Sequence, residues 1–474
     1  MAQDKLTLSI PRWVNNGLVQ AGELEIIADE LDNHGTLLGL TQLALQTQRL
    51  INRQGAKLYS AQDLRLKTQE LQQDGQLVAL GNLSAEITGP LTFTQSMAAG
   101  KQLTLNVAGD LDQRGTLQGQ SVQLTSTGTL THQGRILAGG GESRLSAKDI
   151  VQLEAGSVQA GGNLTLISDN TLNNKGLIGT TGDLLVQAGG LLHNSSMLYA
   201  GGNMRLLSDS LTNVFGTILA GNNLWVQRDA QGNASTSLLN SSGTIETQSG
   251  DITINTGTLT NQREGFVVTE TELAGDSVPD WAGGTSVAIP LSWFKPDEYK
   301  LDTDFESKRT GGTGGKNGCQ CDSTTMYYLY RPKNNQNKMV MVGNKKISID
   351  GKYGAGNIYS GKDTYISSTR LINDASGFYS LNNTRLNLNE LVNKSYQSGI
   401  FYSYLTYKYD ASSAKKYRST EASSAGKYIP YSLVGTPTTE KTVGESYNAL
   451  IQAGGTITAD VKQDRINKEN NLQE

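Results

Sequence analysis

The sequence has few prolines, few aromatic residues and no long apolar run. Its 474 residues include 8 prolines against 54 glycines, and hydrophobic residues make up only 36% of the chain. No stretch approaches the roughly eighteen apolar residues of a transmembrane helix, so we expect no membrane-spanning segment. A formal net charge of −4 excludes a general electrostatic attraction to nucleic acid or to an anionic membrane. The first residues lack the basic-then-apolar pattern of a signal peptide, which is typical of a piece of a larger protein or of a cytosolic one.

Groups for metal binding and catalysis are equally scarce. The chain has two cysteines, Cys319 and Cys321, and three histidines, His34, His132 and His193, which lie far upstream of them. A zinc site would need two further ligands near the cysteines, so we predict no metal and no cofactor. The cysteines form either a strained small-loop disulfide in an oxidising compartment or free thiols. Each histidine lies in a polar corner after a leucine, where we expect it to face solvent. Because no nucleophile, base and acid converge, we predict that the chain is not an enzyme.

A box that runs from a leucine to a glycine recurs through the first half of the chain. It reads, for example, Leu31-Asp-Asn-His-Gly35 and Leu239-Asn-Ser-Ser-Gly243. A second box, Ala160-Gly-Gly-Asn-Leu-Thr-Leu166, recurs with the same period. Such a fixed period indicates a repeat architecture. The anchors of the first box, spaced by 19 to 21 residues, are Leu31, Leu50, Leu71, Leu91, Leu111, Leu130, Val151, Leu172, Leu192 and Leu211.

The pattern within each period indicates short strands. Apolar residues alternate with polar ones, as in Leu164-Thr165-Leu166, which is typical of strands with one buried face. Three such strands joined by Gly/Asn corners consume about twenty residues, and each coil buries its leucines only by stacking on the next. The sequence therefore predicts an all-β fold, a right-handed parallel β-helix with about 20 residues per coil. A leucine-rich-repeat horseshoe would need a helical half and a buried asparagine signature, and the sequence indicates neither.

The composition changes after residue 265, where the repeat is interrupted. Seventeen of the nineteen tyrosines lie beyond this point, together with a charged stretch at 297–309. The repeat boxes return at Leu371 and at Ile451. Loops inserted into a solenoid collect on its faces and often carry binding. We therefore predict β-helix repeats at 1–265, a receptor-binding region at 266–450 that continues the β-helix with insertions at about 275–346 and 395–447, and a return of the repeat pattern at 451–474.

The inserted segments contain the candidate binding residues. Segments 324–331 and 338–342 flank the polar segment 332–337 and predict a β-hairpin, while 400–409 predicts a strand with aromatic residues on both faces. Tyrosine offers a large contact area and few rotatable bonds, which favours recognition surfaces, although β-rich domains also bury tyrosines in ordinary cores. For the group as a whole we favour binding. The candidate contact residues are Tyr327, Tyr330, Arg331, Tyr402, Tyr404, Lys408, Lys415, Lys416 and Tyr417.

The two boxes resemble the filamentous-haemagglutinin repeats of large two-partner-secreted exoproteins. The matching motifs are Leu-x-Asn-x-x-Gly and Ala-Gly-Gly-Asn-Leu-x-Leu, and the resemblance covers about residues 20–265. It implies a secreted filament segment at the bacterial cell surface, which we expect to be a monomeric fragment.

The order of the segments extends this resemblance. Repeats, a divergent tyrosine-rich block and a return of the repeat box resemble the contact-dependent growth inhibition effectors of this family. That resemblance implies recognition of an outer-membrane β-barrel protein on neighbouring target bacteria, through its loops or attached lipopolysaccharide, and delivery of a C-terminal toxin that lies outside this chain. Two alternatives stay open, namely a host-directed adhesin that binds glycan or a matrix protein, and a polysaccharide-active enzyme. The enzyme would need stacked acid pairs, whereas Asp169 and Asp209 resemble turn formers.

Overall fold

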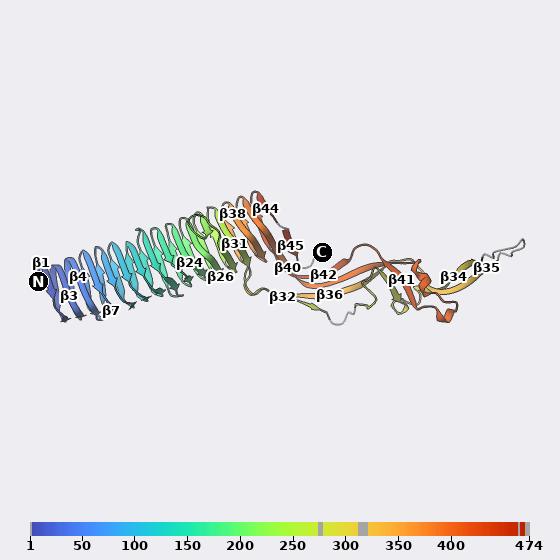
Figure 1. Ribbon diagram of the computed structural model, residues 1–474, viewed down its shortest axis with the longest axis horizontal. Coiled ribbons are helices and arrows are strands. Elements are labelled where there is room, and N and C mark those ends of the chain that lie inside the picture. Colours follow the sequence, from blue (N-terminus) through green and yellow to red (C-terminus); the bar gives the residue numbers. More distant parts are fainter. Residues whose placement is uncertain (1, 274–277, 311–320, 463–464, 470–474) are drawn as a thin grey trace. The chain divides into compact units, whose positions relative to one another are not determined.

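The computed structural model describes residues 2–273, 278–310, 321–462 and 465–469. Within these ranges the chain consists of β-strands, turns and three short 3-10 helices, without an α-helix (Figure 1). No helix of these ranges is long and apolar enough to cross a membrane. The chain divides into two packing units. The first unit comprises Met1–Phe266, Gly351–Tyr396 and Tyr447–Glu474, and the second comprises Val267–Asp350 and Gln397–Ser446.

The first unit is a parallel β-helix, which confirms the predicted fold class. Each coil places one strand on each of three faces, and each strand pairs in parallel with a strand of the next coil. Leu31 pairs with Leu50 and Leu50 with Leu71, so one coil takes about 20 residues. Figure 1 shows the stacked strands from β1 to β44. The stack also continues across both insertions, because Leu259 pairs with Leu371 and Phe378 pairs with Ile451.

Face 1 is formed by short strands that end before a corner. They are β5 (Lys57–Ser60), β8 (Gln76–Ala79), β11 (Ser96–Ala99), β14 (Thr116–Gly119), β17 (Arg135–Ala138), β20 (Ser157–Ala160), β23 (Leu177–Thr180), β25 (Met197–Ala200), β27 (Thr217–Ala220), β30 (Thr244–Thr247), β37 (Asn357–Ser360), β39 (Gly377–Ser380) and β43 (Leu450–Ala453).

Face 2 carries the strands of the Ala-Gly-Gly-Asn-Leu box. They are β1 (Ala2–Ser9), β6 (Asp63–Thr68), β9 (Leu83–Ile87), β12 (Gln102–Val107), β15 (Ser121–Ser126), β18 (Ser143–Ala147), β21 (Leu164–Ser168), β28 (Leu224–Gln227) and β44 (Ile457–Val461).

Face 3 carries the strands of the leucine-to-glycine box. They are β2 (Arg12–Asn15), β7 (Glu70–Gln73), β10 (Leu91–Phe93), β13 (Leu111–Gln113), β16 (Thr129–His132), β19 (Asp149–Gln152), β22 (Leu172–Asn174), β29 (Ser235–Ser241) and β45 (Arg465–Glu469). Longer strands cross more than one face. They are β3 (Leu18–Asn33), β4 (Thr36–Asn52), β24 (Leu184–Asn194), β26 (Met204–Val214), β31 (Ile252–Gln262), β38 (Thr364–Asp374) and β40 (Thr384–Tyr409).

Aliphatic side chains fill the interior of the first unit because alternate residues of each strand point inward. On face 2, Leu43, Leu64, Leu83 and Leu103 pair in successive coils, and all four are fully buried. Burial of one such side chain contributes roughly 2 kcal/mol. A single coil has no second layer to cover its leucines, so stacking between coils stabilises the fold.

A column of buried amide side chains runs along face 3. The Asn194 amide donates to Asn213 Oδ1 at 2.8 Å, and the Asn213 amide donates to Asn240 Oδ1 at 2.8 Å. All three residues are fully buried. The expectation that the repeat lacks a buried asparagine signature is therefore wrong. The asparagine of the Leu-x-Asn box lies two residues after its leucine on one strand, so both side chains share the inward face.

We expect Asn213→Leu to lower the stability of the neighbouring coils by about 2–5 kcal/mol, because the Asn194 amide loses one of its acceptors and the Asn240 side-chain oxygen loses its donor in a fully buried column. Thermal unfolding and amide hydrogen exchange between residues 194 and 240 would measure the loss. Asn82→Leu is the matched control, since Asn82 bonds to Asp63 in an exposed corner, and it should cost less than about 0.5 kcal/mol. Equal losses of stability in the two variants would show that a buried asparagine of the column stabilises the fold no more than an exposed one.

One predicted anchor, Val151, and the first residue of one quoted box, Leu239, are each wrong by one residue. Ile150, and not Val151, pairs with Leu130 in the interior. Leu238, and not Leu239, is buried on the inward face. In both pairs the neighbouring residues are aliphatic, so composition does not distinguish them. A shift of one residue nevertheless turns a side chain to the opposite face of a strand.

His132 also differs from the prediction, because it is 1% exposed and does not face solvent. It occupies the amide column of face 3, where its Nδ1–H donates to Gln113 Oε1. Burial lowers the pKa of His132 to about 4. His34 is exposed and His193 is half-buried. The expectation that the histidines face solvent is therefore wrong for His132, correct for His34 and correct only in part for His193.

The second unit contains an antiparallel sheet in the order β33–β41–β40–β36–β32, with β42 also paired to β40. The strands not yet given are β32 (Val267–Glu272), β33 (Ser286–Pro290), β36 (Lys338–Asp350), β41 (Tyr428–Leu433) and β42 (Thr438–Tyr447). The second unit also contains the 3-10 helices η1 (Leu291–Trp293), η2 (Ser413–Tyr417) and η3 (Ala422–Ser424). The unit has its own core of Val287, Ile289, Phe294, Val340, Leu405, Tyr407, Ile429 and Tyr431.

A separate two-stranded sheet consists of β34 (Tyr299–Thr310) and β35 (Cys321–Pro332). The predicted hairpin between 324–331 and 338–342 is therefore wrong. Segment 324–331 belongs to β35 and pairs with β34, whereas β36 pairs with β40 and β32. The prediction paired the two apolar segments that are nearest in the sequence. In the structure, the partner of 324–331 is β34, which lies in the charged stretch at 297–309.

Candidate recognition surface

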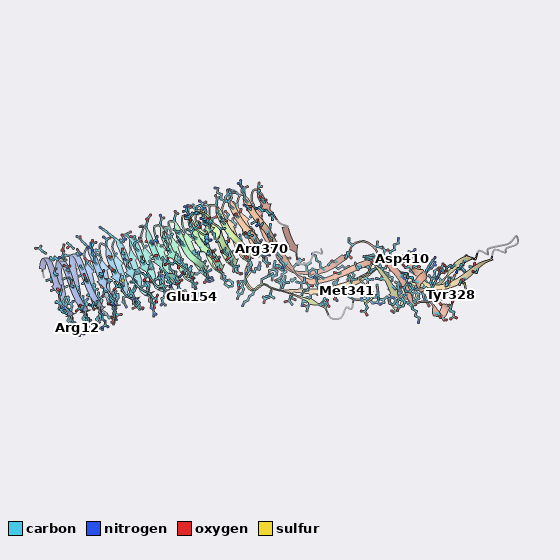
Figure 2. The ribbon with its side chains drawn as sticks, in the orientation of Figure 1. Arg12, Glu154, Tyr328, Met341, Arg370 and Asp410 are labelled. Atoms are coloured by element: carbon cyan, nitrogen blue, oxygen red, sulfur yellow. The ribbon has the colours of Figure 1, made fainter. Side chains whose placement is uncertain are left out.

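The β34–β35 hairpin is the part of the second unit with the most unusual surface. Its two strands pair in register from Tyr299–Pro332 to Thr310–Cys321, without a third strand beside them in their sheet. An isolated two-stranded ribbon is marginally stable in water, so it needs additional support. Tyr328, labelled on this hairpin in Figure 2, exchanges two backbone hydrogen bonds with Ser419, at 2.7 and 3.0 Å.

One face of the hairpin, which we call the apolar face, exposes large apolar side chains. Phe305 is directly opposite Met326, and Thr303 is opposite Tyr328. Phe305 is 61% exposed, while Leu301 and Met326 are each 41% exposed. Alternate residues of a strand share a face, so Leu301, Thr303 and Phe305 of β34 lie on the same side of the ribbon. Met326 and Tyr328 of β35 lie on that side too, because they are paired with Phe305 and Thr303. Contiguous exposed apolar groups of this kind mark interaction sites on soluble proteins.

The opposite face is charged and carries its own contacts. The Arg418 guanidinium lies 4.0 Å from the centre of the Tyr327 ring and pairs with Asp304 at 3.4 Å and with Glu306. The Arg331 guanidinium lies 3.8 Å from Asp304. These contacts connect the hairpin to the segment after η2, and they account for the half-buried position of Tyr327.

Asp410 organises the turn that leads to η2 and Arg418. Its carboxylate accepts hydrogen bonds from the Ser412 backbone N–H at 3.0 Å and from the hydroxyls of Ser413 and Ser432 at 2.6 and 3.1 Å. The hydroxyl donors of Ser412 and Ser413 hold the pKa of Asp410 far below its usual range. The carboxylate is therefore a structural anion that fixes the turn (Asp410 is labelled in Figure 2).

The candidate tyrosines differ in their surroundings. Tyr330 packs against the core of the second unit, with its ring 5.7 Å from that of Tyr299. Tyr417 is half-buried, and its ring lies 5.9 Å from that of Tyr428. Tyr402 and Tyr404, on β40, are also half-buried. The remaining candidates, all exposed, are Lys408, Lys415 and Lys416.

The sequence interpretation did not identify the apolar face. Leu301 and Phe305 lie in a stretch rich in charged residues, yet apart from Thr303 its residues alternate between apolar and charged from Tyr299 to Glu306. That alternation is the signal that could have found the strand. Trp293 was also missed: it is 52% exposed, with its ring 5.5 Å from that of Trp281.

The cysteines and the groups that could bind a metal ion are the other features that the sequence singled out. Whether Cys319 and Cys321 form a disulfide or are free thiols lies outside the described residues, since Cys319 is not described and only the backbone of Cys321 is. No group of three or more His, Cys, Asp or Glu side chains in the described ranges could hold a metal ion.

The parallel coils and the leucine and asparagine columns define a β-solenoid repeat protein. The family model for the haemagglutinin repeat matches residues 19–86, 87–134 and 138–264. The chain belongs to the haemagglutinin-repeat family, which confirms the predicted resemblance. No solved structure matches the chain.

The relatives are long proteins of the CdiA type. The chain is 49% identical to "Deoxyribonuclease CdiA" of Dickeya dadantii (strain 3937), over 100% of this chain and 15% of the relative. It is 41% identical to "tRNA nuclease CdiA" of Yersinia mollaretii, over 98% of this chain and 15% of the relative. It is 30% identical to "16S rRNA endonuclease CdiA" of Enterobacter cloacae, over 98% of this chain and 16% of the relative. The chain thus spans about 15% of the length of the curated relatives that it matches.

Proposed function

We propose that this chain is a segment of a secreted, cell-surface filament that acts in contact-dependent growth inhibition. The first unit serves as the rigid repeat support, and the second unit recognises an outer-membrane β-barrel protein on a neighbouring bacterium. Recognition enables delivery of a toxin that is encoded outside this chain. The observation that carries the proposal is the apolar face of the β34–β35 hairpin, with Phe305 61% exposed.

The chemistry of this face favours a protein partner. Aromatic residues and methionine are enriched at protein interfaces, and a few such anchors supply most of the binding energy. Phe305, Met326 and Tyr328 supply these groups together. Lys415 and Lys416 on η2 add exposed positive charge in the same unit. We therefore expect apolar anchors surrounded by polar contacts, with the candidate lysines in the polar surround.

The names of the relatives support a toxin outside this chain. Three relatives are named for nucleases that differ in substrate, namely DNA, tRNA and 16S rRNA. All three match at least 98% of this chain, but the match covers only 15–16% of their own length. A region that is shared while the named substrate changes is better suited to a common step, such as attachment, than to nuclease specificity.

A pull-down tests the proposal directly. The tagged chain is incubated with detergent-solubilised outer membranes of target bacteria, and we expect it to recover one β-barrel protein. Target cells that lack this protein should no longer bind the chain. Binding that survives in every single-receptor deletion but is inhibited by free sugars would instead support the host-directed or glycan-binding adhesin.

A further inference from the structure

The first unit has a surface groove that the proposed recognition of a receptor by the second unit does not use. The groove lies on face 2 and has a volume of about 450 Å³. It extends over the coils from Gln123 to Trp225, and both apolar and polar side chains line it. Arg144, Thr165, Leu185, Arg205 and Trp225 are among the residues that line it.

The groove arises from the lengths of the side chains in one outward-facing column. Arg144 pairs with Thr165, Thr165 with Leu185, Leu185 with Arg205, and Arg205 with Trp225, in successive coils. The shorter Thr165 and Leu185 thus lie between longer residues and form a floor. Parallel strands are about 4.8 Å apart, so the backbones at Arg144 and Arg205 are separated by about 14 Å along the stack.

The long residues at the two ends offer positive charge and an aromatic wall. The Arg205 guanidinium lies 5.0 Å from the centre of the Trp225 ring, which holds both side chains in place. Both arginines are exposed, and neither forms an ion pair with any residue that the structure describes. A guanidinium presents a planar set of donors that matches a carboxylate or sulfate group.

A rim of fixed polar groups follows one side of the floor. The Asp183 backbone N–H donates to Asn163 Oδ1 at 3.0 Å, and the Asn203 backbone N–H donates to Asp183 Oδ1 at 2.7 Å. These bonds place an amide or a carboxylate on each coil in a defined orientation. Such groups donate to and accept from hydroxyls.

We propose that this groove binds an acidic oligosaccharide that lies along the stack of coils. Its anionic groups contact Arg144 and Arg205, a sugar ring packs against Trp225, and its hydroxyls bond to the rim of Asn163, Asp183 and Asn203. A sugar chain is favoured over a nucleic acid because Glu142 and Asp183 also line the groove: their carboxylates accept hydrogen bonds from sugar hydroxyls, whereas they would repel a nucleic acid, which has a phosphate on every unit.

Isothermal titration of the whole chain with defined tetrasaccharides tests the proposal. The probes are hyaluronan, which has carboxylates, chondroitin sulfate, which also has sulfates, and maltotetraose, which is neutral. We expect binding of at least one acidic probe, weakening as salt is raised, and at least tenfold weaker binding of maltotetraose. The two acidic probes distinguish a carboxylate from a sulfate ligand.

Matched variants locate the site. Arg144→Ala, Arg205→Ala and Trp225→Ala should each weaken binding of the acidic probe about tenfold or more. Arg65→Ala is the control, because Arg65 is exposed in the same column but lies outside the groove, between Ala44 and Ser84. Unchanged circular dichroism would show that the variants are folded. If neither acidic probe binds, if maltotetraose binds equally well, or if Arg65→Ala weakens binding as much, the proposal is wrong.

Discussion

Phe305→Ser combined with Met326→Ser should reduce binding of the chain to target bacteria at least about tenfold, the loss expected when interface anchors are truncated. Both side chains are exposed on the apolar face, so their replacement removes little buried area from the folded protein. The melting temperature should therefore change little, because surface substitutions usually alter stability by less than about 0.5 kcal/mol. Flow cytometry with the labelled chain measures the binding.

The control for this experiment is Met339→Ser. Met339 is 58% exposed and belongs to β36 in the main sheet of the second unit, away from the β34–β35 ribbon. It removes a comparable exposed apolar group without touching the hairpin. Binding that falls equally in the control, or that persists in the double variant, would mean that the apolar face is not the recognition surface.

His132→Gln should make the β-helix less sensitive to acid: the free energy of unfolding that the wild type loses between pH 6.5 and 4 should shrink by up to about 3 kcal/mol. The pKa of His132 is lowered by burial from its ordinary value of 6.5 to about 4. Between these values the unfolded chain binds a proton that the folded chain does not, so stability falls as the pH falls from 6.5 to 4. Above pH 6.5 the residue contributes no pH dependence. The difference of about 2.5 pKa units corresponds to roughly 3 kcal/mol.

Glutamine is the suitable replacement because it occurs on both sides of His132 in the amide column. Gln113 and Gln152 occupy the paired positions in the preceding and following coils. Thermal unfolding of both proteins at pH 7.5, 5.5 and 4.5 measures the effect. His34→Gln is the control for loss of a surface histidine: His34 is exposed and contacts Asp32 at 3.1 Å, so this substitution should change the stability by less than about 1 kcal/mol at each pH. If wild type and His132→Gln lose stability in parallel between pH 7.5 and 4.5, the buried histidine is not acid-sensitive.

The sequence predicted the β-helix because its period is fixed by identical contacts in each coil. Leu31, Leu50 and Leu71 recur where stacked coils must bury the same position. Details within a coil were harder to predict. Adjacent aliphatic residues such as Ile150 and Val151 are equivalent in composition, and only pairing with neighbouring coils selects the inward one. The burial of His132 follows from the same pairing.

The candidate surface could be predicted only in part. A β-rich insertion with tyrosines was expected, but which strands pair depends on contacts that are distant in sequence. β36 pairs with residues 399–407 of β40, more than fifty residues away, in place of the neighbouring β35. The exposure of Phe305 and Met326 follows from the β34–β35 pairing, which the sequence interpretation did not include. The receptor-binding role of 266–450 and of the candidate residues stays a prediction.

Removal of the second unit tests the central claim most directly. Val267 pairs with Asp350, and the Gln397 side chain donates to Ser446 Oγ at 3.1 Å, so a short glycine-serine linker can close each gap. The account predicts that this deletion variant retains the β-sheet signal and melting behaviour of the β-helix, while its binding to target bacteria falls to background. If the shortened chain still binds the same cells with unchanged affinity, recognition lies in the coils, and the proposed role of the second unit is wrong.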